Sequence, residues 1–267
     1  PHWQGGGCVP GLREAALALA PRVAGTRHRL DVEVAPIHPL EAEQGIQGRA
    51  ELLRQLADAR ARLDSRRPER VFAVGGDCGI EVAVLSYLNA QRHGSLAVVW
   101  LDAHGDLNTP QSSPSGHFHG MPLRVLLGDG DPAFTALVDQ PLLPAQVVLA
   151  GTRALDPPEG EVVKARGFRV ISPEVLAEDP SSLVRWIRST GLSRAYLHLD
   201  LDVCDPREVP DVACPTPGGP SVGALVRVLR AVSTEVEIVG ASLTEATFAG
   251  PAIPAQLDPL LEWFRDA

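Results

Sequence analysis

Short hydrophobic runs without polar alternation recur along this chain, and most of them end in a polar or glycine-rich stretch. Such runs are typical of strands buried on both faces of a parallel sheet, whereas strict alternation is typical of half-exposed strands. The clearest runs are Leu-Ala-Val-Val-Trp at residues 96–100 and Ala-Tyr-Leu-His-Leu at residues 195–199. We predict strands at residues 30–34, 71–74, 96–100, 146–150, 168–171, 195–199 and 236–243.

Segments of helical length lie between these runs. Residues 50–63 carry apolar side chains on one face and arginines on the other, the pattern of a helix packed against a core. Further helices are predicted at residues 12–19, 79–88, 182–189, 222–232 and 254–264. Strands that alternate with helices imply a mostly parallel sheet between two helical layers, a three-layer α/β/α sandwich. Because the chain shows no repeat and no linker, residues 1–267 are predicted to form a single domain.

The strand at residues 96–100 leads into Asp102, His104 and Asp106, which occupy every second position. In extended backbone, side chains two residues apart point to the same side. Two close carboxylates repel each other unless a cation or a proton lies between them. Because ligands bind at the carboxyl ends of parallel strands, this stretch predicts a metal site.

A second acidic pair, Asp200 and Asp202, follows the strand at residues 195–199. One such pair is ambiguous, since aspartate is common at strand ends as a turn former or a helix cap. The two motifs together supply four carboxylates and one imidazole, which are enough for two divalent ions. We therefore favour a metal centre over a structural role for these residues.

Charge and cysteine content narrow the class of protein. The formal net charge of −9 argues against a nucleic-acid partner. No apolar run reaches the roughly 20 residues of a membrane-spanning helix, so no membrane association is expected. The four cysteines form no Cys-x-x-Cys pair and are expected to be reduced thiols of a cytoplasmic protein.

Residues 109–120 form a long loop rich in proline, serine and glycine, directly after the first acidic motif. Long loops in compact domains are commonly functional. His117 and His119 lie in this loop, and three roles are open to them: metal binding, proton transfer, or a place on the surface.

The order of these motifs resembles that of the arginase/agmatinase (ureohydrolase) superfamily. The matching stretches are Gly75-Gly76-Asp77, residues 102–108, residues 115–120, Asp200-Leu201-Asp202 with Asp205-Pro206, and Glu245 after the last strand. The resemblance implies an arginase-like fold around about eight strands, the first of which is expected to be shortened or absent before Pro1. It also implies a binuclear manganese (Mn²⁺) centre that hydrolyses guanidinium compounds, usually within a homo-oligomer (trimer or hexamer).

Carried over by position, the resemblance implies five metal ligands. Asp102 and Asp200 would bridge the two ions. Asp106 would complete the shell of one ion, and His104 and Asp202 would bind the other.

The clearest departure from the family's pattern is Cys78, which stands where the family has a metal-binding histidine after Gly-Gly-Asp. It would coordinate as a thiolate, lie beside the ion without binding it, or leave that site empty and the enzyme mononuclear. A thiolate favours zinc, cobalt or iron, whereas carboxylates favour manganese.

The chemistry suits these residue types. Two divalent ions lower the pKa of a bridging water, so that a hydroxide can attack the guanidinium carbon. The resemblance implies that Glu245 holds the guanidinium and that His119 relays protons. Asp106 would pass the hydroxide proton to the departing nitrogen.

The predicted substrate is arginine or a related guanidino compound, with urea and an amine as products. Arginases bind the amino-acid part of the substrate at positions similar to Asn108, Ser115 and Asp156, but this chain has His117 in place of a loop asparagine. Asp156 has a second interpretation as the cap of a helix that begins at Pro157. The alternatives are an agmatinase, a guanidino-acid hydrolase, a formiminoglutamase, or a catalytically silent protein with this fold.

Overall fold

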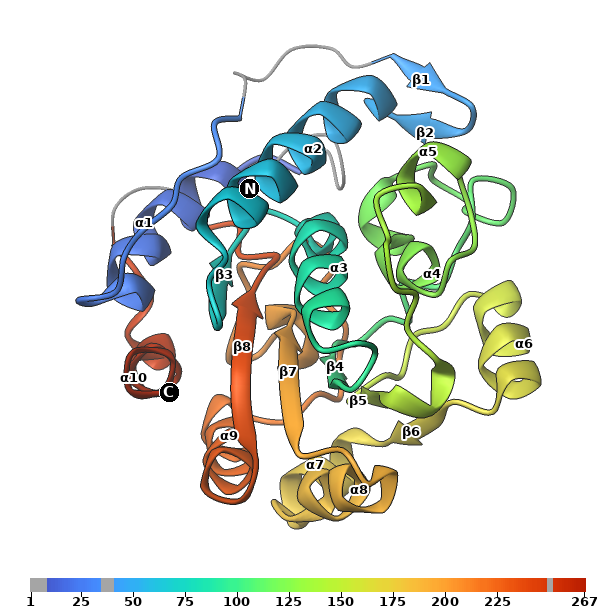
Figure 1. Cartoon of the computed structure of the whole chain (residues 1–267). Helices are drawn as coiled ribbons and strands as arrows, with labels where there is room; N and C mark the ends of the chain where they lie inside the picture. Colours follow the sequence, from blue (N-terminus) through green and yellow to red (C-terminus); the bar gives the residue numbers. More distant parts are fainter. Residues whose placement is uncertain (1–8, 35–40, 249–251) are drawn as a thin grey trace.

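The computed structural model describes residues 9–34, 41–248 and 252–267, and its centre is a parallel sheet in the order β3-β8-β7-β4-β5-β6 (Figure 1). The strands of this sheet are β3 (Val71–Val74), β4 (Ala97–Leu101), β5 (Val147–Ala150), β6 (Arg169–Ile171), β7 (Arg194–Leu199) and β8 (Glu237–Leu243). A separate antiparallel hairpin consists of β1 (Ala42–Glu43) and β2 (Ile46–Gln47). All residues of β4 and β5 are buried, which explains why these runs lack polar alternation.

Helices cover both faces of the sheet (Figure 1). They are α1 (Leu12–Ala24), α2 (Arg49–Arg66), α3 (Glu81–Gln91), α4 (Pro122–Leu126), α5 (Pro132–Thr135), α6 (Pro157–Arg166), α7 (Pro173–Glu178), α8 (Ser182–Thr190), α9 (Val222–Glu235) and α10 (Asp258–Asp266). One hydrophobic cluster joins one face of β4 and β7 to α8, α9 and α10, and another joins the opposite face to α3 and α4. The predicted α/β/α sandwich is therefore confirmed. The short helices α4, α5 and α7 were not predicted, because so few residues show no periodicity.

One predicted strand is wrong, because residues 30–34 belong to no strand. The sheet has six strands among its described residues, whereas the resemblance implies about eight. Burial along residues 30–34 does alternate, from half-buried Leu30 and Val32 to exposed Asp31 and Glu33. However, the segment and β3 line a common cavity of about 540 Å³, and none of their described residues are paired with each other. Alternation identifies one buried face, whereas a strand also needs a partner within hydrogen-bond distance.

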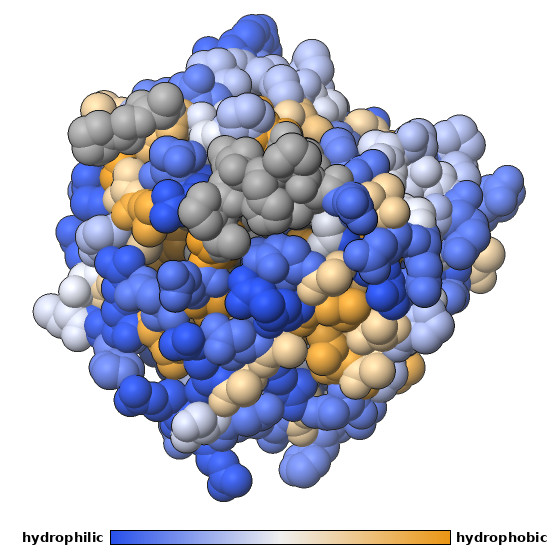
Figure 2. Space-filling model, turned by 90° about the horizontal axis from the view of Figure 1, so that it is seen from above, coloured by the Kyte–Doolittle hydropathy of each residue, from blue (hydrophilic) through white to orange (hydrophobic). Residues whose placement is uncertain are grey.

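The strand order gathers the ends of four strands at one edge of the sheet. β8 lies between β3 and β7, and β7 lies between β8 and β4. Because all these pairs are parallel, the loops that follow the four strands leave the sheet on the same side. Figure 2 looks onto this side, where most of the coloured surface is hydrophilic and the apolar patches are small. The predicted site residues come from these loops.

Within the described residues, no helix has both the length and the apolar character needed to cross a membrane. Cys78, Cys204 and Cys214 are free thiols, and Cys8 lies outside the described residues.

Candidate active site

Two strand ends lie side by side at the base of the site. In the β4–β7 pair Leu101 is opposite Leu199, so the next residues, Asp102 and Asp200, leave the sheet together. The Asp200 backbone N–H donates to the Leu101 carbonyl at 2.9 Å, which extends the ladder by one bond. Both carboxylates are buried. The register of the sheet therefore brings two acidic side chains together in the interior.

His104 and Asp202 form one group of donor atoms with Asp102. His104 Nδ1 lies 2.9 Å from Asp202 Oδ2 and 3.5 Å from Asp102 Oδ1. The His104 backbone N–H donates to Asp102 Oδ1 at 2.6 Å, and the Ala103 N–H donates to Asp202 Oδ1 at 3.0 Å. One ligand atom from each of the three side chains lies within 4.8 Å of the others. We call this group the outer site, because the His104 side chain is 30% exposed.

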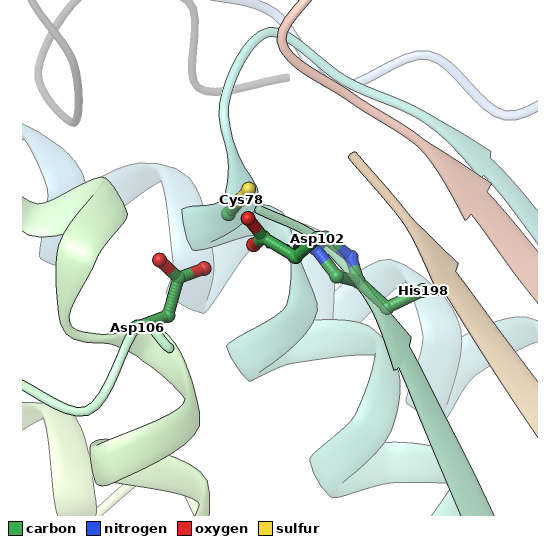
Figure 3. Close-up of side chains that lie close together, drawn as sticks. All are labelled: Cys78, Asp102, Asp106 and His198. Atoms are coloured by element: carbon green, nitrogen blue, oxygen red, sulfur yellow. Dashed lines mark ion pairs between the residues drawn. The ribbon is translucent and has the colours of Figure 1, made fainter. Parts of the chain in front are cut away.

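A second group lies deeper and shares Asp102 with the first. Ligand atoms of Cys78, Asp102, Asp106 and His198 lie within 4.8 Å of one another, and all four residues are buried. Figure 3 shows the His198 ring directed toward Asp102, with Cys78 and Asp106 on the other side of that carboxylate. We call this group the inner site. The two groups share one carboxylate, so ions bound in them would be neighbours.

Cys78 begins a 3₁₀ turn (Cys78–Ile80) directly after the loop that leaves β3. Its Sγ lies 3.2 Å from Asp200 Oδ2 and 3.5 Å from Thr244 Oγ1. Burial raises the pKa of this thiol well above its ordinary value, and the charge of Asp200 raises it further. The sulfur therefore needs a nearby cation in order to become a thiolate.

Asp106 and Glu245 both adopt left-handed backbone conformations, with φ values of 52° and 65°. Residues other than glycine are uncommon in this region, and they cluster at functional sites. The Glu245 backbone N–H donates to the Gly76 carbonyl at 2.7 Å. This bond ties the loop after β8 to the loop after β3.

Glu245 is the contact point of three segments. Its Oε1 accepts a hydrogen bond from the Cys78 backbone N–H at 3.1 Å and lies 3.2 Å from His119 Nδ1. Its Oε2 is buried and has no hydrogen-bond partner. Ligand atoms of Glu245, Cys78 and Asp200 also lie within 4.8 Å of one another. Distance alone therefore permits Glu245 to bind either a metal ion or a substrate.

The buried acids strongly perturb one another. Burial raises the pKa of Asp106 and of Asp200 well above the ordinary value, and the neighbouring Asp102 carboxylate adds to both shifts. Burial also opposes the charge of Asp102, but the imidazoles of His104 and His198 outweigh it and lower its pKa well below the ordinary value. Protons or cations are needed to hold this many acids together.

Burial lowers the pKa of the two histidines nearest the cavity, but carboxylates outweigh it. Asp102 and Asp202 raise the pKa of His104 to about 12, and Glu245 raises that of His119 to about 9. A divalent ion at these carboxylates would compete with the protons, because metal ligands must be deprotonated.

The residues present fit a divalent-metal centre. Asp106 Oδ2 and His198 Nε2 are buried and have no hydrogen-bond partner. Buried polar atoms seldom stay unpaired, and an ion is one of the accepted reasons for an apparent exception. Carboxylates and imidazoles are ligands for manganese and related dications, and the thiol adds a softer donor.

A cavity of about 120 Å³ connects the acidic cluster to the long loop. Every residue predicted to bind the substrate lines it, namely Asn108, Ser115, His117, Asp156 and Glu245. His119 lines it as well. The lining also includes Ser113, Glu159 and Cys214, which the sequence analysis missed.

The structure contains a contact for each interpretation of Asp156, as a substrate-binding residue and as the cap of a helix. Its Oδ2 accepts a hydrogen bond from Asn108 Nδ2 at 2.8 Å beside the cavity. It also immediately precedes α6, and its backbone N–H donates to the Glu159 carboxylate at 2.9 Å. Glu159 in addition accepts from the Leu107 N–H at 2.8 Å. The spacing Asp-x-x-Glu, which is typical of a helix start, was the available signal for Glu159.

His198 and Glu81 were also missed. His198 Nδ1 lies 2.9 Å from Glu81 Oε1, and both residues are fully buried. A signal was present, because His198, Asp200 and Asp202 repeat the every-second-residue spacing of the first acidic motif. The position of His198 inside a hydrophobic run obscured that signal.

Comparison with known proteins gives consistent matches. The model of the arginase family matches residues 10–248. The chain is 35% identical to an arginase of Staphylococcus aureus over 153 residues, which are 55% of this chain and 50% of that protein. It therefore spans about half the length of this curated relative. It is 34% identical to an arginase of Bacillus caldovelox over 224 residues, which are 75% of this chain and 74% of that protein.

A solved structure shows the same fold. The crystal structure of Entamoeba histolytica arginase in complex with L-ornithine is similar with a TM-score of 0.87 and 20% sequence identity, over 99% of this chain and 96% of that one. The family match includes every residue of the outer and inner sites. By the extent of this match, the chain belongs to the arginase family.

Proposed function

We propose that this protein is a metal-dependent ureohydrolase that hydrolyses the guanidinium group of arginine or of a related guanidino compound, releasing urea and an amine. The observation that carries the proposal is the presence of two donor groups that share Asp102. They adjoin a cavity that is lined by Glu245 and by polar loop residues. Membership of the arginase family supports the same reaction class.

The proposed reaction needs a nucleophile stronger than water, because a guanidinium is cationic and resonance-stabilised. Two divalent ions would supply one near neutral pH by lowering the pKa of a water that they share. The outer and inner sites would each hold one ion, with Asp102 and Asp200 between them. Their carboxylates also keep the site attractive to a cationic substrate despite the charge of the ions.

Glu245 would bind and orient the guanidinium. Its Oε1 is already engaged by the Cys78 N–H and His119, whereas Oε2 is buried without a partner. The free oxygen would accept charge-assisted hydrogen bonds from guanidinium N–H groups. The fixed oxygen would prevent rotation of the carboxylate, so the substrate carbon would be held in one position.

Asp106 and His119 would move protons. Asp106 Oδ2 has no hydrogen-bond partner, so this oxygen would accept the proton of the hydroxide and pass it to the departing amine. His119 has a pKa of about 9 beside Glu245 and is protonated at neutral pH. Its side chain is 18% exposed, which permits proton exchange with solvent.

For the substrate, we favour an α-amino acid such as arginine. Asn108 and Asp156 are hydrogen-bonded to each other on the cavity wall, where they offer a donor and a carboxylate to an α-amino and α-carboxylate pair. Ser115 and His117 line the same wall. Agmatine, guanidino acids and formiminoglutamate remain the competing substrates, because a change of loop residue is enough to alter such contacts.

We further propose two bound ions, with manganese in the outer site and zinc, cobalt or iron competing where Cys78 is a donor. A trimer or hexamer of this chain in the cytoplasm is proposed on the family resemblance and on the free thiols.

The test is urea release from arginine, agmatine and guanidinobutyrate, and formamide release from formiminoglutamate, each with metal-free protein reloaded with one metal at a time. The expected result is metal-dependent urea release with arginine as the preferred substrate. No product from any of the four with any metal would support a catalytically silent protein. A preference for another substrate would keep the reaction class and reject the amino-acid assignment.

A further inference from the structure

A buried imidazole lies beneath the acidic cluster, on strand β7 two residues before Asp200. Glu81 Oε1 lies 2.9 Å from Nδ1 of His198, and the Ser242 hydroxyl lies 3.1 Å from it. Trp100 packs against the ring at 3.9 Å between centroids. The ring is thus fixed on one side and along one face.

The other nitrogen of the ring is unpaired. His198 Nε2 is buried without a hydrogen-bond partner, and its distance of 3.8 Å from Asp102 Oδ2 is too long for a hydrogen bond. That oxygen already accepts from Trp100 Nε1 at 3.1 Å. A buried nitrogen that points at a carboxylate without bonding to it requires an explanation.

A metal ion would provide that explanation. Ligand atoms of Cys78, Asp102, Asp106 and His198 are mutually within 4.8 Å, so a single ion among them can reach one sulfur, two oxygens and one nitrogen (Figure 3). Metal-binding histidines almost always anchor their second nitrogen on a carboxylate or a carbonyl, which fixes the ring orientation. Glu81 provides this anchor from the first turn of α3.

We propose that His198 is a ligand of the ion in the inner site and that Glu81 orients it. The inner site then contains an imidazole although Cys78 stands where a histidine ligand was expected, because the imidazole comes from β7 instead. This inference rests on the proposed metal centre. A sulfur, nitrogen and two oxygens form a softer donor set than that of the outer site, which suits zinc or cobalt better than manganese.

The first test asks how many imidazoles coordinate the bound ions, and it compares the wild type with one variant. Metal-free wild type is loaded with Co²⁺, and X-ray absorption fine structure measures imidazole and sulfur scattering around the ions. His104→Ala is measured in parallel, because it removes the imidazole of the outer site. The expected result is that the ion remaining in His104→Ala still shows one imidazole and one sulfur. An ion that shows sulfur without imidazole in that variant would overturn the inference.

The second test measures affinity by competition with a chromophoric chelator. His198→Ala should retain the outer ion and bind the inner ion at least about 100-fold more weakly, and Glu81→Gln should weaken it about 10-fold. Tyr196→Phe is the matched control. It removes a hydroxyl that donates to the same Glu81 oxygen at 3.3 Å, and it should leave both affinities unchanged.

Other outcomes of the second test are equally informative. Unchanged binding of both ions in His198→Ala, with urea release by the wild type intact, would reject the role of His198 and leave the proposed function standing. Wild type that binds no divalent ion would overturn both.

Discussion

The outer site exposes its imidazole to the cavity, whereas the inner site encloses all its donors in the protein interior. The His104 side chain is 30% exposed and lies beside two carboxylates and one hydroxyl. The inner site instead combines the Cys78 sulfur with the anchored ring of His198. One edge of one sheet therefore presents two chemically different groups of candidate metal ligands that share Asp102. We therefore expect the outer and inner sites to differ in how fast they exchange ions and in the metal that they prefer.

The largest effect is expected from the residue that the two sites share. Asp102→Ala should remove a ligand from both groups, so that the protein retains neither ion. The activation free energy of urea release should then rise by several kcal/mol, and the rate should fall roughly a thousandfold or more. Metal content after gel filtration and initial rates would show this. Asp139→Asn, at a side chain that is 59% exposed, is the control and should behave as wild type. A fully loaded Asp102→Ala protein would contradict the shared-ligand arrangement.

Glu245→Gln separates substrate binding from metal binding. The variant should keep both ions but lose about 2–3 kcal/mol of transition-state stabilisation, or roughly 30- to 150-fold in kcat/KM, because a charged hydrogen bond is replaced by a neutral one. Metal analysis and kinetics on the same preparation provide the measurement. If the inner ion is lost together with activity, Glu245 is a ligand, as its proximity to Cys78 and Asp200 also permits.

Cys78→His should reduce the contrast between the sites, because it replaces the soft donor of the inner site with an imidazole. The inner site should then bind Mn²⁺ about tenfold more tightly, or about 1.4 kcal/mol, with a matching gain in Mn²⁺-dependent urea release. In the wild type, bound metal should slow alkylation of this thiol. Cys204→Ala is the control, because Cys204 is equally buried but packs in the hydrophobic core. Identical metal content and activity in wild type and Cys78→His would show that the sulfur is irrelevant.

The smallest effect concerns pH and the His119–Glu245 pair in metal-free protein. The pKa of His119 is raised from its ordinary 6.5 to about 9, so the stability it contributes is complete below pH 6.5 and is lost as the pH rises through about 9. His119→Asn should therefore be less stable than wild type by about 1 kcal/mol at pH 6, with the difference vanishing near pH 10. Thermal unfolding in the presence of a chelator would measure it. A pH-independent difference would mean that the pair does not titrate as described.

Sequence patterns predicted the sheet well where burial alone decides the outcome. The predicted runs match β3, β4, β5, β6, β7 and β8 to within about a residue. Strands β4 and β5 are buried at every position, and such strands need hydrophobic side chains throughout. Residues 30–34 show the limit of this reasoning. Their alternation is real, yet they pair with nothing among the described residues, because pairing depends on a neighbour that the local pattern does not specify.

The same division applies to the site. Local spacing was enough to single out the two acidic motifs, because residues two apart in extended backbone share a side. It also set their position at strand ends, where the chain turns. The candidate donors within each motif, and the divalent ions that such donors suit, could therefore be predicted from the sequence itself.

Contacts between the motifs were decided only by the tertiary structure. The placement of β8 between β3 and β7 brings Glu245 against Cys78, although 167 residues separate them. The packing of α3 on the sheet pairs Glu81 with His198 across 117 residues. Both contacts depend on strand order and helix packing, which arise from the burial of whole surfaces and leave no signal in any short stretch of sequence.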